Sequence, residues 1–561
     1  MRQRIARVAS LPALLAAFAF ALVSVGCHFL LGQVACGDDG DCPASLPFCV
    51  AGQCAAEARE GEGEGEGEGE GEGEGEGEGE GEGEGEGEGE GEGEGEGEGE
   101  GEGEGEGEGE GDPPPLTPHA FVSQASNEVH ALVRDGTDVL LGGRAGGSIA
   151  YQGGAALPLA SGAPFVLKLS DAGGATALFA PLEGGRVRAI VVTPTAVVVA
   201  GTMDGVALTV GGACGTLTRA DADQDAFVAA LAPLTGACLW ARRLGGPATT
   251  NGDIGVSALA FDGSDLFLTG GSNGALEIYD ESGSALGVGG STAGQGFLLR
   301  LSSSGAFGAL LRLDPATDPR ALAVLPGAPP SIYVAGGYGP AATPTVAGLP
   351  LVGSQGAFVL RVQGGGGGFG TPAALSQEVT GTGAVTVSAL AADPVARRLA
   401  VAGSFSGRFL SANAVATDGF LYFVGEDLTL GATASLASSS GADTIDAMTL
   451  GTDGRPIIVG TVPGSSDVTI GISTMSTPDA GSATHALVAK LDLLAGETVR
   501  WHVRLPSNGT VVVSGTTVGL LGTRVDACLG FDVDVRDPLG SLLFAGAGDG
   551  HRELGLLQLG P

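Results

Sequence analysis

The chain has 561 residues, a net charge of −40 and 104 glycines. Residues 60–111 are an unbroken Glu-Gly alternation that contains 26 of the 66 acidic residues, so the rest of the chain has a net charge of −14. This acidic excess argues against nucleic acid or anionic lipid as the main partner, because both are themselves negatively charged.

The N-terminus has the features of a secretory signal over residues 1–26. Three arginines within the first seven residues precede the apolar stretch 11–25, and small residues follow before Cys27. The segment Ser24-Val25-Gly26-Cys27 resembles a bacterial lipoprotein cleavage box, which implies that Cys27 receives lipid. An uncleaved anchor is the alternative, because apolar residues resume after His28 and the whole stretch is long enough to span a bilayer. Both interpretations place the protein outside the cytoplasm, as a lipid-anchored or membrane-anchored protein of the outer membrane or cell surface.

Residues 27–59 contain the predicted anchor and a small cysteine-rich module. Its four cysteines lack the close C-x2-C pairs of a zinc site, and disulfides persist in exported proteins. We therefore expect two disulfides, for which three connectivities are open. The end of the segment is similar to small cysteine-rich modules of other bacterial lipoproteins. The four disulfide candidates are Cys36, Cys42, Cys49 and Cys54.

The linker, residues 60–117, comprises the Glu-Gly tract and a short proline run. A tract with a negative charge at every second residue and no apolar side chain buries no surface, so we expect it to stay disordered. Its predicted role is to hold the following domain away from the membrane.

The main domain, residues 118–561, repeats one pair of sequence features. The first, here called the first anchor, is an apolar strand that ends in glycine. Its copies are Leu140-Leu141-Gly142, Val199-Ala200-Gly201, Leu268-Thr269-Gly270, Val334-Ala335-Gly336, Val401-Ala402-Gly403, Ile458-Val459-Gly460 and Val513-Ser514-Gly515. The second anchor is a later apolar or aromatic strand. Its copies begin at Phe165, Phe227, Phe297, Phe358, Phe420, Leu487 and Cys528.

Successive second anchors are 62, 70, 61, 62, 67 and 41 residues apart, and the repeats show no helical periodicity. A helix-free unit of this length holds about four short strands, and stacking such sheets around an axis buries both their faces. The sequence therefore predicts an all-β protein, a β-propeller with seven blades, although six blades or an open ring also fit. The last unit lacks a clear first strand, so residues 551–559 or residues 119–131 are expected to complete a blade by pairing the two ends.

Several motifs resemble the bacterial seven-bladed β-propeller repeat. They are clearest in Leu239-Trp240-Ala241-Arg242-Arg243-Leu244-Gly245-Gly246, in Gly255-Val256-Ser257-Ala258-Leu259-Ala260 and in Asp225-Ala226-Phe227-Val228-Ala229. The resemblance implies a propeller without fixing what it binds.

Three further features of this domain invite a chemical interpretation. Cys214 and Cys238 lie in one repeat and are expected to form a disulfide. The carboxylates of Asp221, Asp223 and Asp225 are the best candidates for a hard cation such as Ca²⁺, but no EF-hand loop surrounds them, so no metal is predicted. The segment 270–274 matches G-x-S-x-G, yet the strand-to-helix elbow that this motif requires is missing.

The sequence predicts a non-catalytic binding or scaffold module, tethered to the envelope, for a protein or polysaccharide at the cell surface. We expect a monomer without a cofactor. One alternative is an envelope hydrolase or lyase with its site in the propeller funnel, which would need several His, Asp, Glu or Arg side chains at one mouth. The loops offer no such group by sequence. The other alternative is a purely structural protein or adhesin.

Overall fold

Short apolar runs between glycine-rich turns form antiparallel strands throughout the computed structural model, which is nearly all-β. It divides into two units, Met1–Gly101 and Glu102–Pro561. The structure describes residues 48–50, 53–55 and 115–559, the last range with gaps at 124–125, 153, 171–173, 182–183, 221, 247–251, 290–294, 366–367, 415, 439–440, 477–483, 494–497, 508–510, 513–518, 522–523, 532–533, 537–541 and 546–552.

In the first unit the described residues form one hairpin. Strand β1 (Phe48–Val50) pairs with β2 (Gln53–Ala55), and the backbone of Cys49 lies opposite that of Cys54. No helix among the described residues is long and apolar enough to cross a membrane.

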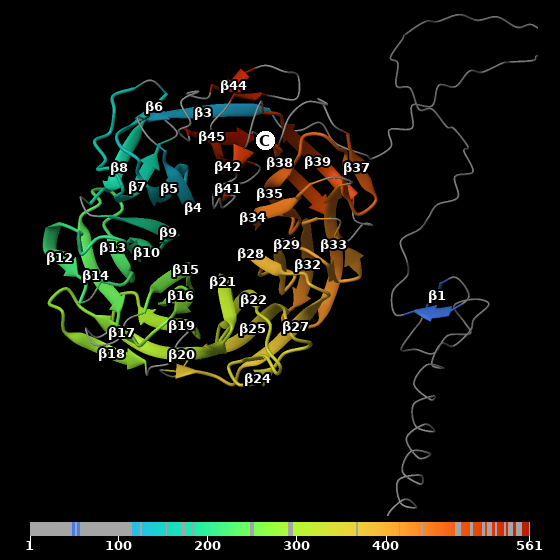
Figure 1. The fold of residues 1–561 in the computed structure, drawn as a ribbon, viewed down its shortest axis with the longest axis horizontal. Coiled ribbons are helices and arrows are strands. Elements are labelled where there is room, and N and C mark those ends of the chain that lie inside the picture. The colour runs from blue at the N-terminus through green and yellow to red at the C-terminus, as the bar shows by residue number, and fades with distance from the viewer. Residues whose placement is uncertain are drawn as a thin grey trace, which may run out of the picture. The chain divides into compact units, whose positions relative to one another are not determined.

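The second unit is a β-propeller, with sheets arranged around a central axis (Figure 1). Six regular blades each contain four main strands that follow one another along the chain. The first three blades are β4 (Glu128–Asp135), β5 (Asp138–Arg144), β7 (Pro164–Leu169) and β8 (Ala175–Phe179); β9 (Gly185–Val192), β10 (Val197–Met203), β13 (Asp225–Leu231) and β14 (Cys238–Gly245); and β15 (Ile254–Phe261), β16 (Asp265–Ser272), β19 (Gln295–Ser302) and β20 (Phe307–Pro315). The next three are β21 (Thr317–Leu325), β22 (Ser331–Tyr338), β25 (Gly356–Gly365) and β27 (Ala373–Thr380); β28 (Val385–Asp393), β29 (Arg398–Phe405), β32 (Asp418–Gly425) and β33 (Leu430–Ser438); and β34 (Thr444–Leu450), β35 (Pro456–Pro463), β38 (Thr484–Asp492) and β39 (Thr498–Leu505).

A further sheet, here called the closing sheet, joins the two ends of the propeller. Its strands are β40 (Val511–Val512), β41 (Gly519–Leu521), β42 (Arg524–Phe531), β45 (Glu553–Leu559), β3 (Leu116–Ser123) and β6 (Ile149–Tyr151). Strand β3 pairs with β45, from Leu116 opposite Leu559 to Phe121 opposite Leu554. The predicted pairing of the two ends is therefore confirmed.

The number of regular blades is six, which corrects the prediction of seven. Cys528 was expected to begin a second anchor, but it lies on β42, between β41 and β45. There, Cys528-Leu529-Gly530 has the apolar-apolar-glycine form of the first anchor. The last repeat is consequently shorter than the others, and β3 supplies its outer strand from the opposite end of the chain. The first anchor proposed at residues 513–515 lies outside the described residues.

Hairpins between the second and third strands of a blade reach back to the preceding sheet. The hairpin β17 (Leu276–Tyr279) and β18 (Ala285–Gly289) extends the edge at β14, and β6 extends the edge at β3. Similar additions come from β30 (Arg408–Phe409) with β31 (Ala412–Asn413), on β27, and from β36 (Val468–Ile470) with β37 (Ser473–Met475), on β33. These additions tie neighbouring sheets by backbone hydrogen bonds and explain the long spacing between the two anchors.

The remaining short elements decorate the loops. They are η2 (Gly212–Cys214), β11 (Ala207–Thr209), β12 (Thr216–Thr218), β23 (Thr345–Val346), β24 (Leu349–Pro350), β26 (Gly368–Phe369), β43 (Val535–Arg536) and β44 (Leu542–Phe544).

The core lies between neighbouring sheets, where the second anchors are buried. Phe227 of the second blade packs with Phe179, Leu140 and Val166 of the first blade, and it is fully buried. Burying an aromatic side chain contributes roughly 1.5–3 kcal/mol, so an aromatic residue recurs where two sheets must be joined.

A hydrogen-bonded chain of side chains fastens the closing sheet to the first blade. Arg134 of β4 donates to Asp526 of β42 at 2.5 Å, and the amide of Gln558 donates to the same carboxylate at 3.0 Å. Gln558 contacts His119 at 2.6 Å, and His119 contacts the hydroxyl of Tyr151 at 2.7 Å. Asp526 is fully buried, so this chain satisfies a carboxylate that would otherwise be costly to bury.

Candidate ligand site in the axial cavity

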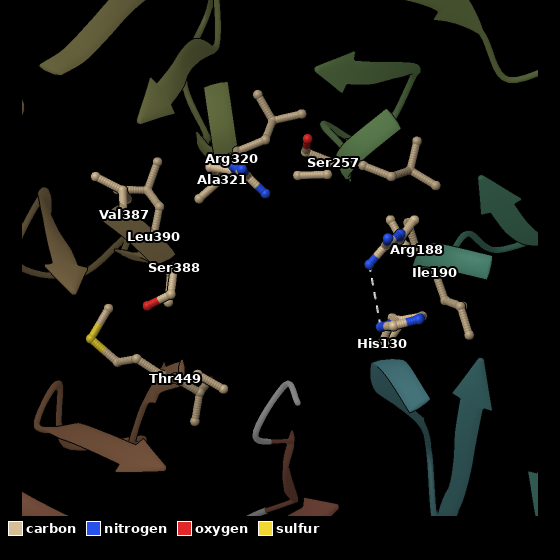
Figure 2. Close-up of a pocket in the computed structure, with 18 of the residues that line it drawn as sticks. His130, Arg188, Ile190, Ser257, Arg320, Ala321, Val387, Ser388, Leu390 and Thr449 are labelled. Carbon is tan, nitrogen blue, oxygen red and sulfur yellow. Dashed lines mark hydrogen bonds between the residues drawn. The ribbon is translucent and has the colours of Figure 1, made fainter. Parts of the chain in front are cut away.

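A cavity of about 1250 Å³ lies on the axis of the propeller. The inner strands β4, β9, β15, β21, β28 and β34 line it, together with loop residues such as Gln224 and Asp253. Both polar and apolar side chains line its wall, as Figure 2 shows for His130, Ser257 and Leu390.

Each of these six inner strands carries a β-bulge at the same place. In the first blade Val129 lies opposite Gly143 and Ala131 lies opposite Gly142, so His130 is an extra residue without a partner. A bulge of this kind redirects a side chain and interrupts the alternation of faces. The six extra residues all line the cavity: His130, Arg188, Ser257, Arg320, Ser388 and Asp446.

The bulge also explains why glycine ends the first anchor. A Cβ atom on Gly201 would stand 1.9 Å from the carbonyl oxygen of Arg186, which the bulge brings toward the neighbouring strand. The corresponding distances in the other five blades lie between 1.7 and 2.3 Å. In the first blade the equivalent residue is Gly143, one position after the glycine that the sequence suggested. The glycines that share this role are Gly143, Gly201, Gly270, Gly336, Gly403 and Gly460.

Sequence reasoning missed the six bulge residues, although a signal for them exists. Each lies between an apolar residue or proline and an alanine that an apolar residue follows. The tetrapeptides are Val129-His130-Ala131-Leu132, Val187-Arg188-Ala189-Ile190, Val256-Ser257-Ala258-Leu259, Pro319-Arg320-Ala321-Leu322, Val387-Ser388-Ala389-Leu390 and Ile445-Asp446-Ala447-Met448. The sequence predicts no group of His, Asp, Glu or Arg side chains from the loops at one mouth of the funnel. The structure places His130, Arg188, Arg320 and Asp446 on the cavity wall, at bulges of the inner strands.

His130 and Arg188 meet on one side of the cavity. The Arg188 guanidinium lies 3.4 Å from Nδ1 of His130, a contact drawn in Figure 2, and Nε2 of His130 lies 3.3 Å from Glu128. Burial, and then the charge of Arg188, lower the pKa of His130 to about 4. The imidazole is consequently neutral at physiological pH.

Asp446 and Ser388 belong to neighbouring blades elsewhere on the cavity wall. Thr444 donates to the Asp446 carboxylate at 3.0 Å, and burial raises the pKa of Asp446 to about 6. The Ser388 hydroxyl donates to the carbonyl of Ile445, which links the fifth blade to the sixth.

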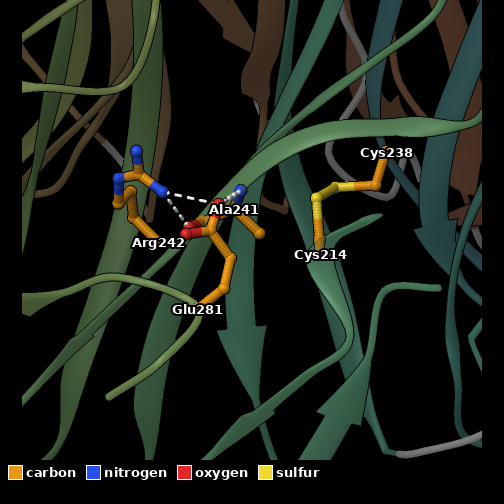
Figure 3. Close-up of a disulfide and its surroundings, with 5 residues drawn as sticks. All are labelled: Cys214, Cys238, Ala241, Arg242 and Glu281. Atoms are coloured by element: carbon orange, nitrogen blue, oxygen red, sulfur yellow. Dashed lines mark hydrogen bonds and ion pairs between the residues drawn. A yellow bond between two sulfur atoms is a disulfide. The ribbon is translucent and has the colours of Figure 1, made fainter. Parts of the chain in front are cut away.

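The predicted disulfide between Cys214 and Cys238 is confirmed, and it lies away from the axial cavity. It joins the loop at η2 to the beginning of β14 (Figure 3). Further along β14, Glu281 accepts hydrogen bonds from the Ala241 amide at 3.0 Å and from Arg242 at 2.7 Å. Glu281 lies between β17 and β18, so the disulfide and this contact both hold β14 in place.

The aspartates considered for a cation have other partners. Asp225 forms a buried ion pair with Arg243 at 2.6 Å, and Asp223 accepts a hydrogen bond from the Gly252 amide at 2.6 Å. Asp221 lies outside the described residues. Among the residues that the structure describes, no three His, Cys, Asp or Glu side chains form a group that could hold a metal ion.

The structure describes only some of the remaining predicted site residues. Cys27, Cys36 and Cys42 lie outside the described residues, and Cys49 and Cys54 are described by their backbone pairing alone. In the G-x-S-x-G segment, Ser272 ends strand β16, is buried, and donates to the carbonyl of Gly274 at 2.7 Å. Its hydroxyl therefore holds a turn.

Comparisons with known proteins add little to this description. No protein-family model matches the chain, and no curated protein matches it either. One similar solved structure is described as a crystal structure of the eukaryotic initiation factor. It covers 68% of this chain and 92% of its own chain, with 10% identical residues and a TM-score of 0.27. A match of this quality carries no argument about function.

Proposed function

We propose that this protein is a non-catalytic binding module of the bacterial cell envelope that seats a protein or polysaccharide ligand at its axial cavity. One observation supports this most strongly: six blades each direct one bulge residue into the same cavity. Bulges are found next to functional sites because they re-aim side chains at little cost to the rest of the sheet. A pre-formed cavity with a few polar groups is also the common form of a ligand site.

The N-terminal sequence supports a tether for this module. Lipid on Cys27 would anchor the chain, and the 52-residue Glu-Gly tract would separate the anchor from the propeller. Such a tract spans roughly 40 Å as a coil and approaches about 170 Å when fully stretched. Mass spectrometry of the mature N-terminus tests the tether, because lipidated Cys27 is expected there. An unmodified chain that still begins at Met1 would instead indicate the uncleaved anchor.

Binding is tested with the full-length chain on an array of bacterial envelope polysaccharides and purified surface proteins. The variant Ser257→Trp places a bulky indole in the cavity, whereas Leu234→Trp introduces the same side chain at a position that is 87% exposed. We expect wild type and Leu234→Trp to bind the same ligand and Ser257→Trp to lose it. Equal binding by wild type, Leu234→Trp and Ser257→Trp would show that the ligand binds outside the cavity. No binding by wild type would contradict the proposed function.

A hydrolase or lyase is the second candidate, because His130, Arg320 and Asp446 line one cavity. Nδ1 of His130 faces the Arg188 guanidinium, and burial lowers the pKa of His130 to about 4, so the imidazole is a weak base and a poor candidate for a general base. Asp446, with its raised pKa, is the better candidate for a general acid. Turnover of an envelope polysaccharide by wild type that Asp446→Asn abolishes would establish this alternative, and the absence of turnover would remove it.

A further inference from the structure

Arg188 is a half-buried cation without an ion pair among the described residues, in an otherwise acidic protein. Burial, and then the charge of Arg186, lower the pKa of its guanidinium. Among the described residues no carboxylate forms an ion pair with it: the nearby Glu128 pairs with His130 at 3.3 Å and with Arg186 at 4.0 Å. The guanidinium contacts the neutral imidazole of His130 instead. A cation that is partly removed from water and has no ion pair favours an incoming anion.

Arg320 adds a second positive charge to the same region. Its partner Asp318 is 59% exposed and Arg320 itself is 52% exposed, so solvent screens this ion pair and leaves the arginine free to contact a ligand. Figure 2 shows Arg320, Ser257, Arg188 and His130 along one side of the cavity, with Ser388 on the other side. Arg188 and Arg320 are close enough for the charge of Arg320 to disfavour protonation of Arg188. An anion between them would relieve this repulsion.

The cavity offers little for a neutral sugar ring. No Phe, Tyr or Trp is among the described residues that line it, although stacking on such rings is a common way to hold an uncharged ring. Arginine, by contrast, binds carboxylate, sulfate and phosphate with two parallel hydrogen bonds. The wall therefore suits a charged substituent better than an apolar or neutral ring.

We propose that the axial cavity recognises an oxyanion (a carboxylate, sulfate or phosphate carried by the ligand) through Arg188, with Ser257 and Arg320 as further donors. This inference rests on the proposed function and specifies the chemistry of its ligand. The guanidinium of Arg188, on the second blade, supplies the charge and two parallel N–H donors. The Ser257 hydroxyl donates from the third blade, and Arg320 lies on the fourth blade.

Isothermal titration calorimetry of the full-length chain tests the inference with four probes: oligogalacturonate, a sulfated heparin disaccharide, inorganic phosphate, and neutral oligogalactose as the uncharged counterpart. Wild type is expected to bind at least one anion and not the neutral oligosaccharide. Removal of the charge in Arg188→Gln should weaken anion binding by roughly tenfold or more, because a charge-assisted hydrogen bond is lost. Arg188→Lys keeps the positive charge but lacks the two parallel N–H donors of the guanidinium, so it should give an intermediate affinity.

The matched control is Arg397→Gln, which removes an exposed arginine that pairs with Glu426 and does not line the cavity. Its affinity should equal that of wild type, and thermal melts must show that all variants fold. If Arg188→Gln binds as wild type does, or the neutral oligosaccharide binds equally well, the anion site is wrong. The variant Ser257→Trp, which places a bulky indole in the cavity, separates the two failures. If only Ser257→Trp abolishes binding, the cavity remains the site and its preference for anions is refuted. If Ser257→Trp also binds normally, the cavity itself is not the site.

Discussion

The carbonyl oxygen of Gly255 lies 1.9 Å from the position that a Cβ atom on Gly270 would occupy. This close approach results from the bulge at Ser257, and it recurs in all six regular blades. The same geometry that directs a polar side chain into the cavity therefore requires a glycine on the adjacent strand.

Gly270→Ala is expected to destabilise the propeller by about 2–4 kcal/mol, because two backbone segments must move apart to admit the methyl group. The neighbouring Gly271 has nothing within 4 Å of its would-be Cβ, so Gly271→Ala should change stability by less than about 1 kcal/mol. Urea unfolding of the two variants measures the difference. Equal stabilities would show that the bulge does not bring these strands together.

Asp526→Ala should weaken the junction between the closing sheet and the first blade. Removal of the buried carboxylate leaves Arg134 without its ion pair, a change that costs about 3–5 kcal/mol when the partner stays buried. The control Asp318→Ala breaks the exposed pair with Arg320 and should cost no more than about 1 kcal/mol. Thermal melts of both variants decide the matter, and a melting temperature for Asp526→Ala close to that of wild type would refute the proposed role of this ion pair.

The double variant Cys214→Ala/Cys238→Ala should be less stable than wild type by about 3 kcal/mol, from the entropy of a closed loop of this length. The two cysteines are 24 positions apart in the sequence. Wild type in the presence of dithiothreitol should unfold at the same denaturant concentration as the double variant. A reductant that leaves the unfolding curve unchanged would mean that the disulfide is absent in solution.

Asp443 should make stability depend on pH. It is fully buried, and burial, with the nearby charge of Asp418 as a lesser cause, raises its pKa from 3.8 to about 7. The folded state therefore holds a proton that the unfolded state releases between pH 4 and pH 7, so this stabilisation is complete below pH 4 and lost as pH rises through 7. Each pKa unit corresponds to about 1.4 kcal/mol, so the effect amounts to a few kcal/mol.

The variant Asp443→Asn removes this titration. It should exceed wild type in unfolding free energy at pH 8 and approach it at pH 4, as measured by urea unfolding at both values. A difference between variant and wild type that is the same at both pH values would show that Asp443 titrates normally.

The repeat structure was predictable because the fold spaces its buried residues regularly. Phe227 and the other aromatic second anchors recur since each fills the same junction between sheets, and Gly201 recurs since the bulge leaves no room for a side chain. The pairing of Cys214 with Cys238 followed from their place in one repeat. These features depend on neighbours within one blade or one junction, so a single sequence reveals them.

The closing sheet and the cavity were harder to foresee. The outer strand β3 and its partner β45 come from opposite ends of the chain. Whether Cys528 belongs to a first or a second anchor depends on β3 completing the sheet, which the sequence around Cys528 does not show. The bulge residues include His130, Arg188 and Asp446, so chemical type does not repeat at this position. What repeats is one unpaired residue in the pairing of the first two strands of each blade. The hydrogen-bond register of the strands shows this residue, whereas amino-acid composition does not.

The measurement that tests the central claim most directly is the thiol reactivity of single-cysteine variants along the inner strands. If the bulges direct six side chains into one solvent-filled cavity, cysteines at those positions should react with a small charged methanethiosulfonate roughly tenfold or more faster than Val129→Cys and Ile445→Cys, above the wild-type background. Val129 and Ile445 precede the bulges, are not among the residues that line the cavity, and are 0% and 2% exposed. The six test positions are His130, Arg188, Ser257, Arg320, Ser388 and Asp446. Control cysteines that react as fast as the bulge cysteines would mean that the inner strands lack the bulges, and the account of the cavity would be contradicted.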